Sequence, residues 1–252
     1  MIGYARLLVA ILLGCSLSRT SFAKLPDGIT GCSISLSRNE FNQCVVDKVR
    51  EMTPHMMKGI PGMRLPALDP FVLPSLSIDR SLDQLVIKTN ITNIQATGAS
   101  NYAINEIDVD PRALTLGMKI HMPFVQVRGN YEVRGRLLLL VLNGVGAFKG
   151  NFSNIDVLVR AKGKEAVDKS GVTRVEVDKL QLKIRVGHGN IRLKSPPQHA
   201  VTADAAQAFF NANPRLVLDI ASPIIEDTAA TISRALAVRA LSSLTKDEIL
   251  LK

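Results

Sequence analysis

The sequence contains no tryptophan, only 4% aromatic residues and only four histidines among its 252 residues. Neither an H-E-x-x-H metal motif nor a G-x-S-x-G nucleophile motif is present. We therefore expect a protein that is not an enzyme and that holds no metal or cofactor. A site assembled in space from distant residues stays open at this point. The four histidines are His55, His121, His188 and His199.

Long apolar runs are scarce as well. The N-terminus combines Arg6, a short apolar segment over residues 7–13 and the small residues Ser21 and Ala23 around Phe22. This pattern predicts a signal peptide over residues 1–23 and a secreted, extracellular mature protein that begins at Lys24. No other apolar run approaches the roughly 20 residues of a membrane-crossing helix, so we expect no transmembrane segment.

Acidic residues are fewer than basic ones, at 22 against 31, which gives a net charge of +9. Without Arg6 and Arg19 of the predicted signal peptide, the balance is 29 − 22 = +7. The basic residues alternate with apolar ones, as in residues 180–186, which is typical of the solvated face of strands. No nucleic-acid-binding motif is present, so we expect no nucleic-acid partner. An anionic lipid surface stays open as an alternative partner.

No segment rich in proline, serine and glycine divides the chain, so we expect one domain over residues 24–252. Cys15 lies in the predicted signal peptide, which leaves Cys32 and Cys44. Two cysteines in an oxidising compartment predict one disulfide, because a metal site would need two further ligands. The sequons at Asn90 and Asn151 predict N-glycosylation, and both fall on the polar side of predicted strands.

The two ends of the mature chain show helical patterns. Ser37 and Glu40 form a capping box, which predicts a helix that ends at Gly59. A second pattern predicts a helix over residues 224–244, with Pro214 and Pro223 breaking or kinking the segment before it. Apolar residues recur at helical spacing in the first helix at Phe41, Val45, Val49, Met52 and Met56.

Between these ends, over residues 82–193, the apolar period changes to two. Long strands with one polar and one apolar face indicate antiparallel pairing. Helices at both ends of a long run of strands predict an α+β fold. The parity changes near Ser153, which predicts a β-bulge there. The apolar face of one strand carries Leu114, Leu116, Met118, Ile120 and Met122.

The glycine-rich segment over residues 129–150 decides between a phosphate loop and a curved strand. Gly144, Gly146 and Gly150 give G-x-G-x-x-x-G and precede a strand pattern, so the dinucleotide-binding motif is excluded. We assign these glycines to a turn and a curved sheet. Upstream, Gly129 and Gly135 lie on the apolar face, where another element can approach closely. Residues 137–142 are apolar on both faces, which predicts a strand buried on both sides.

Several short motifs occur in an order that carries a family resemblance. They are Cys32 and Cys44, Gly59-Ile60-Pro61, Leu68-Asp69-Pro70, Gly129-x-Tyr131-x-x-x-Gly135-Arg136, Gly144-x-Gly146, Phe210-Asn211 and Lys246-Asp247-Glu248-Ile249. The ordered set, which covers nearly all of the mature chain, resembles the takeout / juvenile-hormone-binding protein family of insects. The resemblance implies a long C-terminal helix wrapped by a strongly curved antiparallel sheet, a super-roll, with a shorter N-terminal helix.

The resemblance also implies an apolar tunnel that carries a small hydrophobic molecule such as a terpenoid hormone or a fatty acid. The protein would be a monomeric carrier, and a receptor is a candidate partner. Alternatives are a basic protein that docks on lipid surfaces and a signalling protein in which the tunnel is mainly structural. The hydroxyl of Tyr131 would anchor a polar group of the ligand. We expect the tunnel to be lined by Tyr131, Met52, Met56, Leu116, Met118, Ile120, Met122, Val133, Phe148, Phe152, Ile220 and Ile224.

Overall fold

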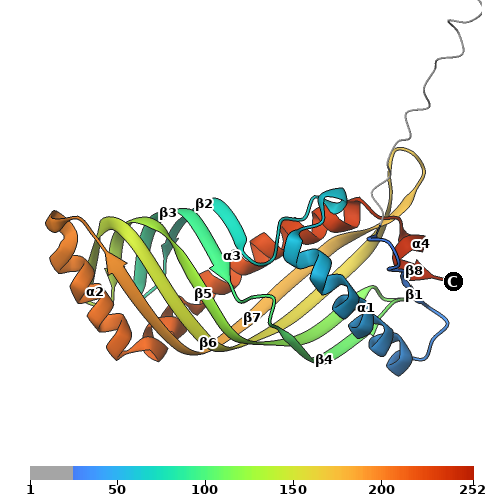
Figure 1. Cartoon of the computed structure of the whole chain (residues 1–252), viewed down its shortest axis with the longest axis horizontal. Coiled ribbons are helices and arrows are strands. Elements are labelled where there is room, and N and C mark those ends of the chain that lie inside the picture. The colour runs from blue at the N-terminus through green and yellow to red at the C-terminus, as the bar shows by residue number, and fades with distance from the viewer. Residues whose placement is uncertain (1–24) are drawn as a thin grey trace, which may run out of the picture.

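The computed structural model describes residues 25–252, and the predicted signal peptide lies outside these described residues. A curled antiparallel sheet and a long C-terminal helix dominate the architecture (Figure 1). The helices are α1 (Arg38–Lys58), α2 (Ala200–Ala212), α3 (Pro214–Ser242) and α4 (Lys246–Ile249), with short 3-10 turns at Pro61–Met63 and Pro197–His199. No helix within residues 25–252 is long and apolar enough to cross a membrane.

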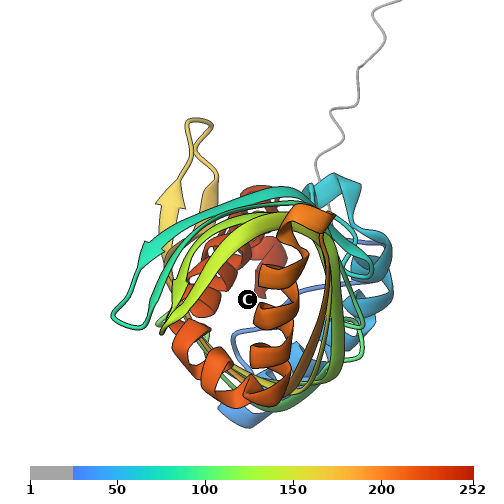
Figure 2. The same cartoon turned by 90° about the vertical axis from the view of Figure 1, so that its left-hand side faces the viewer.

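Six strands form the main sheet in the order β2-β3-β5-β6-β7, with β4 paired to part of β5. The end-on view in Figure 2 shows the sheet curling around α3, with α2 across the near end. The predicted α+β class and the helix wrapped by a curved sheet are therefore confirmed. The strands are β2 (Phe71–Ser81), β3 (Leu85–Thr97), β4 (Ala103–Asp110), β5 (Thr115–Leu137), β6 (Leu140–Val167) and β7 (Thr173–Lys194).

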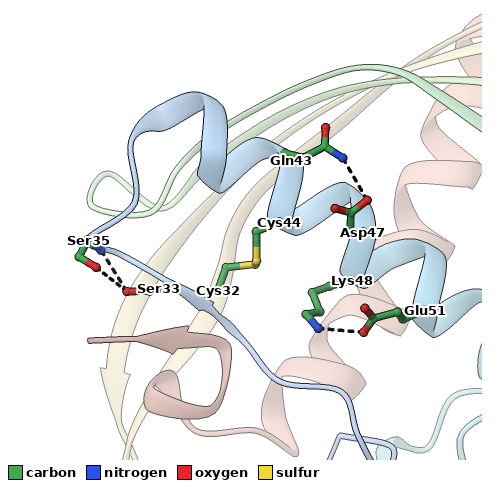
Figure 3. The surroundings of a disulfide bond; sticks show 8 residues. All are labelled: Cys32, Ser33, Ser35, Gln43, Cys44, Asp47, Lys48 and Glu51. Carbon is green, nitrogen blue, oxygen red and sulfur yellow. Dashed lines mark hydrogen bonds and ion pairs between the residues drawn. A yellow bond between two sulfur atoms is a disulfide. The ribbon is translucent and has the colours of Figure 1, made fainter.

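The N-terminal helix begins and ends where the sequence predicts. The Ser37 side chain accepts from the backbone of Glu40, and the Glu40 carboxylate accepts from the backbone of Ser37, which completes the capping box. The helix ends at Gly59, whose φ is +84°. The predicted disulfide between Cys32 and Cys44 is confirmed, and it joins α1 to the short strand β1 (Cys32–Ser33), as Figure 3 shows.

The strand β1 pairs in parallel with β8 (Leu250–Leu251) at the end of the chain. The sequence did not predict this pair. It brings the two ends of the described chain together and buries Cys32, Phe41 and Leu250 in one cluster. The disulfide therefore fixes α1 and the C-terminal residues at the same end of the molecule (Figure 1).

Two strands of the sheet contain an asparagine in the left-handed backbone region. Asn93 in β3 has φ +52°, and the register of β3 against β5 shifts between Thr92 and Gln95. Asn154 in β6 has φ +53°, at the position where the buried parity changes from even to odd. Asparagine tolerates this conformation better than other side chains do. The change of parity near Ser153 is therefore confirmed, but the predicted β-bulge is wrong, because the register of β6 against β5 and β7 continues unchanged past Asn154.

The prediction for residues 137–142 is wrong. The chain reverses at Leu138, whose φ is +53°, and β6 returns along β5 from Leu140. The side chain of Leu139 is 94% exposed and that of Val141 is 63% exposed, so this segment is not buried on both sides. A turn formed by leucines lacks the glycine and asparagine by which a hairpin is usually recognised in a sequence.

Two related assignments also need correction. Gly144, Gly146 and Gly150 lie inside β6 and not in a turn. The C-terminal helix begins at Pro214, ten residues before the predicted start, and continues through Pro223. Proline at the first helical position is favourable because its missing N–H needs no partner there. The tertiary contacts of α3 thus override the helix-breaking effect of Pro223.

The helices α2 and α3 satisfy the free backbone groups of the edge strand β7. Asn211 accepts from the Ile191 N–H (2.9 Å) and donates to the Ile191 carbonyl (2.9 Å). Gln207 accepts from the Leu193 N–H (2.7 Å), and Glu226 accepts from the Ile184 N–H (3.1 Å). An edge strand that is covered in this way cannot recruit a further strand. Arg234 of α3 donates to the carbonyls of Val177 and Asp178 of the same strand.

Candidate functional site

The inner face of the sheet, which faces α3, is apolar along the centre of the molecule. Met118 of β5 lies opposite Val159 of β6, which in turn lies opposite Leu182 of β7. The two following rows have the same character, and their members Ile155 and Val157 are buried. The predicted residues Leu116, Met118, Ile120 and Met122 thus lie in rows with Val157, Val159, Ala161, Ile155, Leu182, Ile184, Leu180 and Val186.

This interior is less closely packed than an ordinary core. No large side chain of residues 25–252 is fully buried, and only twelve apolar residues among them count as buried. Of the twelve residues predicted to line a tunnel, Ile224 is buried at 8% exposure, whereas the others are half-buried. Close-packed interiors leave few voids and bury their large aliphatic side chains completely. An incompletely filled interior would leave inward-facing apolar side chains half-exposed, as they are here.

Tyr131 lies on the inner face near the α2 end of the sheet. With Val133, it lines a cavity of about 30 Å³ that is closed on the other side by Ala203 of α2. Its hydroxyl lies 2.7 Å from the Ser195 Oγ. In a pair of hydroxyls one donates to the other, so one hydroxyl hydrogen stays free for a further acceptor. The hydroxyl thus has a protein partner, and the role of Tyr131 toward a ligand stays a prediction.

The two inner-face phenylalanines of β6 lie over glycines of neighbouring strands. Phe148 pairs with Gly129 of β5, and a Cβ on that glycine would lie 3.0 Å from the Phe148 ring. Phe152 pairs with Gly189 of β7, where a Cβ would lie 3.2 Å from the ring. An aromatic ring that covers a cross-strand glycine shields backbone and holds the register. These glycines therefore make room for rings, which the sequence alone did not show.

The remaining predicted residues lie toward opposite ends of α3. Ile220 and Ile224 pack with Leu85 and Leu137 at the α2 end, whereas Met52 and Met56 pack with Leu244 and Ala240 at the α1 end. Ile224 and Ala240 are sixteen residues apart on one helix, which corresponds to about 24 Å at 1.5 Å per residue. The predicted residues therefore do not form one compact pocket but extend along the length of the molecule.

Adjacent acidic residues of α3 connect the helix to both edges of the sheet. Glu226 pairs with Lys183 of β7 (2.7 Å), and Asp227 pairs with Arg80 of β2 (2.7 Å). Burial would raise the pKa of Glu226. The hydrogen bond from Lys183, the Ile184 N–H and the charge of Lys183 outweigh burial and hold this pKa below its ordinary value.

Two grooves follow the line where α3 meets β7. One, of about 550 Å³, is lined by Leu180, Leu182 and Pro223 together with charged residues that include Glu226 and Arg160. The other, of about 380 Å³, lies toward the C-terminal end of α3 and includes Val238 and Leu241. None of the residues predicted to bind a ligand lines either groove. The grooves thus lie apart from the residues that were predicted to bind a ligand.

The described part of the chain forms no cluster of metal-binding side chains. Within residues 25–252, no three histidine, cysteine, aspartate or glutamate residues lie together in a way that could hold a metal ion. The His121 Nδ1 lies 2.8 Å from the Asp156 Oδ1, on the outer face of the sheet. Among the hydrogen bonds of residues 25–252, none joins this pair to a serine, threonine or cysteine side chain. What the arrangement offers for binding is the apolar surface of the inner face.

The two sequons lie on the sheet. Asn90 of β3 is exposed, and its Oδ1 accepts from the Ser77 hydroxyl (3.1 Å). Asn151 of β6 is half-buried, and its Oδ1 accepts from Gln126 (3.0 Å). The Nδ2 atom, to which a glycan is attached, makes no hydrogen bond to residues 25–252 in either case. Glycosylation stays a prediction at both positions.

The sequence did not show which polar side chains hold the elements around this interior in place. Asn211 belongs to the Phe210-Asn211 motif, so its importance was visible, but not its hydrogen bonds to β7. Glu226 interrupts an apolar helical stripe, which could have marked it as a residue with a special partner. Thr245 and Glu248 form a second capping box, the same signal that identified α1. Ser195, the partner of Tyr131, gives no signal.

A curled antiparallel sheet closed by a long helix, with an apolar inner face, defines an α+β binding fold. A family model described as haemolymph juvenile hormone binding protein matches residues 7–251, and the chain belongs to this family. The family is defined by binding and not by catalysis. The resemblance seen in the motifs is therefore confirmed.

Solved structures agree with this assignment. The crystal structure of Epiphyas postvittana Takeout 1 is similar with a TM-score of 0.71 and 19% identity, and the match covers 89% of this chain and all (100%) of that one. A lipopolysaccharide binding protein matches with a TM-score of 0.30 and 14% identity over 75% of this chain and 38% of that one. A comparison with curated proteins gives no match.

Proposed function

We propose that the protein is a secreted, monomeric carrier, and not an enzyme, that holds one small hydrophobic molecule between α3 and the curled sheet. Residues 24–252 would form the single carrier domain. The half-exposed apolar side chains of the inner face carry this proposal, because a filled core would bury them. The description of the family as a haemolymph binding protein and the disulfide support secretion. Delivery through a receptor would fit such a carrier.

The energetics suit a ligand with a long aliphatic part. Burial of about ten methylene groups contributes roughly 8 kcal/mol at about 0.8 kcal/mol each, which corresponds to about micromolar affinity. Ordering the ligand reduces this value. The free hydroxyl hydrogen of the Tyr131 and Ser195 pair could donate to an ester, epoxide or acid group and restore part of it.

A tryptophan placed inside the sheet tests whether the interior is unfilled. Met118→Trp adds a large side chain to the inner face, and its neighbour Lys119 points to the outer face of the same strand. If the interior is unfilled, Met118→Trp keeps the stability of the wild type but takes up less of a fluorescent fatty acid. If the interior is packed, the same change destabilises the fold by about 1–3 kcal/mol.

Lys119→Trp is the matched control. It removes only an exposed ion pair with Glu106, which contributes at most about 1 kcal/mol, and it should leave uptake unchanged. Because the wild type has no tryptophan, each variant also reports its own folding by fluorescence. Equal uptake by the inner variant, the control and the wild type would contradict an interior binding site.

A further inference from the structure

The outer face of the sheet carries a group of cations that the carrier function does not explain. Arg128 of β5 lies directly opposite Lys149 of β6, which lies directly opposite Arg192 of β7, and Lys194 lies on the next row of β7. We call these four residues the cationic band. Neighbouring strands are about 4.8 Å apart, so the row spans about 10 Å across three strands.

The charges of the cationic band are not balanced by the protein. None of its four side chains forms an ion pair with a carboxylate of residues 25–252, whereas other outer-face cations such as Lys119 and Lys164 do. Like charges directly opposite each other in a sheet destabilise it. Three cations in register without a carboxylate are therefore unfavourable unless an external anion neutralises them.

The rows on either side of the band contain no acidic residue. On one side of Arg128, Lys149 and Arg192, the row holds Thr97, Gln126, Asn151 and Asn190. On the other side, Thr92, Asn130 and Ala147 share their row with Lys194 of the band itself. Amides and hydroxyls of this kind can donate hydrogen bonds to anionic oxygens. Arg128 is already oriented, since its Nε donates to the Gln95 Oε1 (2.7 Å). The band and its rows thus form a surface that offers donors and positive charge together.

The shape of this surface suits an extended polyanion better than one enclosed anion. Arg128, Lys149, Arg192 and Lys194 are all exposed, and they line an open groove of about 610 Å³ with no buried charged group in it. Four residues before Arg128 on the same face, Phe124 is 45% exposed. An exposed apolar ring beside basic side chains is the composition of surfaces that lie at a membrane interface.

We infer that the cationic band is a docking surface for a bilayer that contains anionic phospholipids. Its cations would contact lipid phosphates while Phe124 enters the headgroup region. The choice of lipid over other polyanions rests on the proposed carrier function, because an apolar cargo must be collected from, or delivered to, a lipid phase. Asn151 lies two residues from Lys149 on the same face, so a glycan there would cover the band.

The test uses the full mature chain with Asn151→Gln, which removes any glycan at this position. Binding to vesicles of phosphatidylcholine alone is compared with binding to vesicles that also contain phosphatidylserine. We expect binding only to the anionic vesicles and a steep loss as salt is raised. The triple variant Arg128→Gln, Lys149→Gln and Arg192→Gln should bind about a hundredfold more weakly, at roughly fivefold for each cation.

A charge-matched control is available on the same strands. Arg160, Lys162 and Lys179 are exposed outer-face cations of β6 and β7 that also form no ion pair within residues 25–252. Their triple change to glutamine should leave most of the vesicle binding intact. Equal losses in the two triple variants would show that only net charge matters and would overturn the inference. Binding to RNA or to a sulfated glycan but not to anionic vesicles would overturn it too.

Measurements of cargo uptake and of vesicle binding distinguish a failure of the carrier proposal from a failure of this inference. Uptake of a fluorescent fatty acid is measured on the same triple variants, and the band variant should retain it, because none of its changes is on the inner face. A protein that docks on anionic vesicles but takes up no apolar molecule contradicts the carrier function alone. A protein that loads cargo but ignores vesicle charge contradicts the docking surface alone.

Discussion

The close approach of a neighbouring strand explains why position 135 is a glycine. A Cβ at this position would lie 2.1 Å from the backbone carbonyl oxygen of Val86 in β3. The sequence correctly predicted that an element approaches this glycine. The structure identifies that element as a strand, whereas the fold suggested by resemblance pointed to the helix.

Gly135→Ala should therefore destabilise the protein by about 1–3 kcal/mol, because either β3 or β5 must move to admit the methyl group. Gly62→Ala is the control, since a Cβ there meets nothing within 4 Å. The free energy of unfolding of both variants is measured by urea denaturation. Equal stability of the two variants would contradict the close approach of β3.

Tyr131→Phe tests the anchor at the residue scale. The variant loses a hydrogen bond to Ser195 and should be less stable by about 0.5–1.5 kcal/mol. If the hydroxyl pair also anchors a ligand, the affinity for a ligand with a polar head falls several-fold, whereas that for a plain alkane chain does not change. The two affinities are measured by fluorescence titration. An equal change for both ligands would mean that Tyr131 is structural only.

The face of the sheet on which a side chain lies could be predicted better than the residue that it contacts. The inner-face parity of Tyr131, Val133 and Met118 followed from the alternation of apolar residues. The partner of Tyr131 could not, because Ser195 lies 64 residues away and nothing marks it. Hydrogen bonds between distant segments depend on the tertiary fold and leave no local pattern.

At the scale of elements, the contact of α3 with both sheet edges decides how the interior is closed. Glu226 accepts from the backbone of Ile184 and pairs with Lys183, while Asp227 pairs with Arg80 on the opposite edge. The Glu226 side chain is 14% exposed, whereas that of Asp227 is 58% exposed. The connection to β7 should therefore matter more for stability than the one to β2.

Glu226→Ala should destabilise the fold by about 1–3 kcal/mol, because it leaves the Ile184 N–H without its acceptor. Glu226→Gln keeps an acceptor oxygen and should lose less. Asp227→Ala is the exposed control and should lose less than about 1 kcal/mol. Urea denaturation at neutral pH ranks the three variants. A larger loss for Asp227→Ala than for Glu226→Ala would contradict the role of Glu226.

Acid titration adds a second readout on the same element. The pKa of Glu226 is below its ordinary value of 4.5 in the folded protein. A lowered pKa contributes stability that is complete above pH 4.5 and that is lost as pH falls from there through the folded pKa. The wild type should therefore lose more stability than Glu226→Gln below pH 4.5. Parallel curves for the two proteins would contradict this pKa shift.

Elements with strong periodicity could be predicted, and those defined by contacts could not. The capping box and apolar spacing identified α1 within a residue of its bounds. The helix α2 was not predicted, and only Asn213 separates it from α3. The leucine turn at Leu138 was missed because leucine has no turn preference, and its position is set by the pairing of β5 with β6.

At the scale of the whole molecule, the fold was recognisable because helix, long strands and helix follow one another in order. Whether the interior is filled could not be recognised from the sequence, since a strand with one apolar face looks the same over a filled core and over a cavity. The half-exposed state of the inner side chains is the observation that supports the proposed unfilled interior. The residues predicted to bind a ligand lie in separate clusters along α3, and their contact with a ligand stays a prediction.

The most direct test of the carrier function is native mass spectrometry of the mature protein secreted from insect cells, followed by organic extraction of what it holds. We predict one apolar molecule per protein, released on denaturation, and a lower occupancy in Met118→Trp than in Lys119→Trp. A protein that is empty, and that also fails to take up fatty acids or terpenoids, would contradict the proposal that the interior binds a hydrophobic ligand.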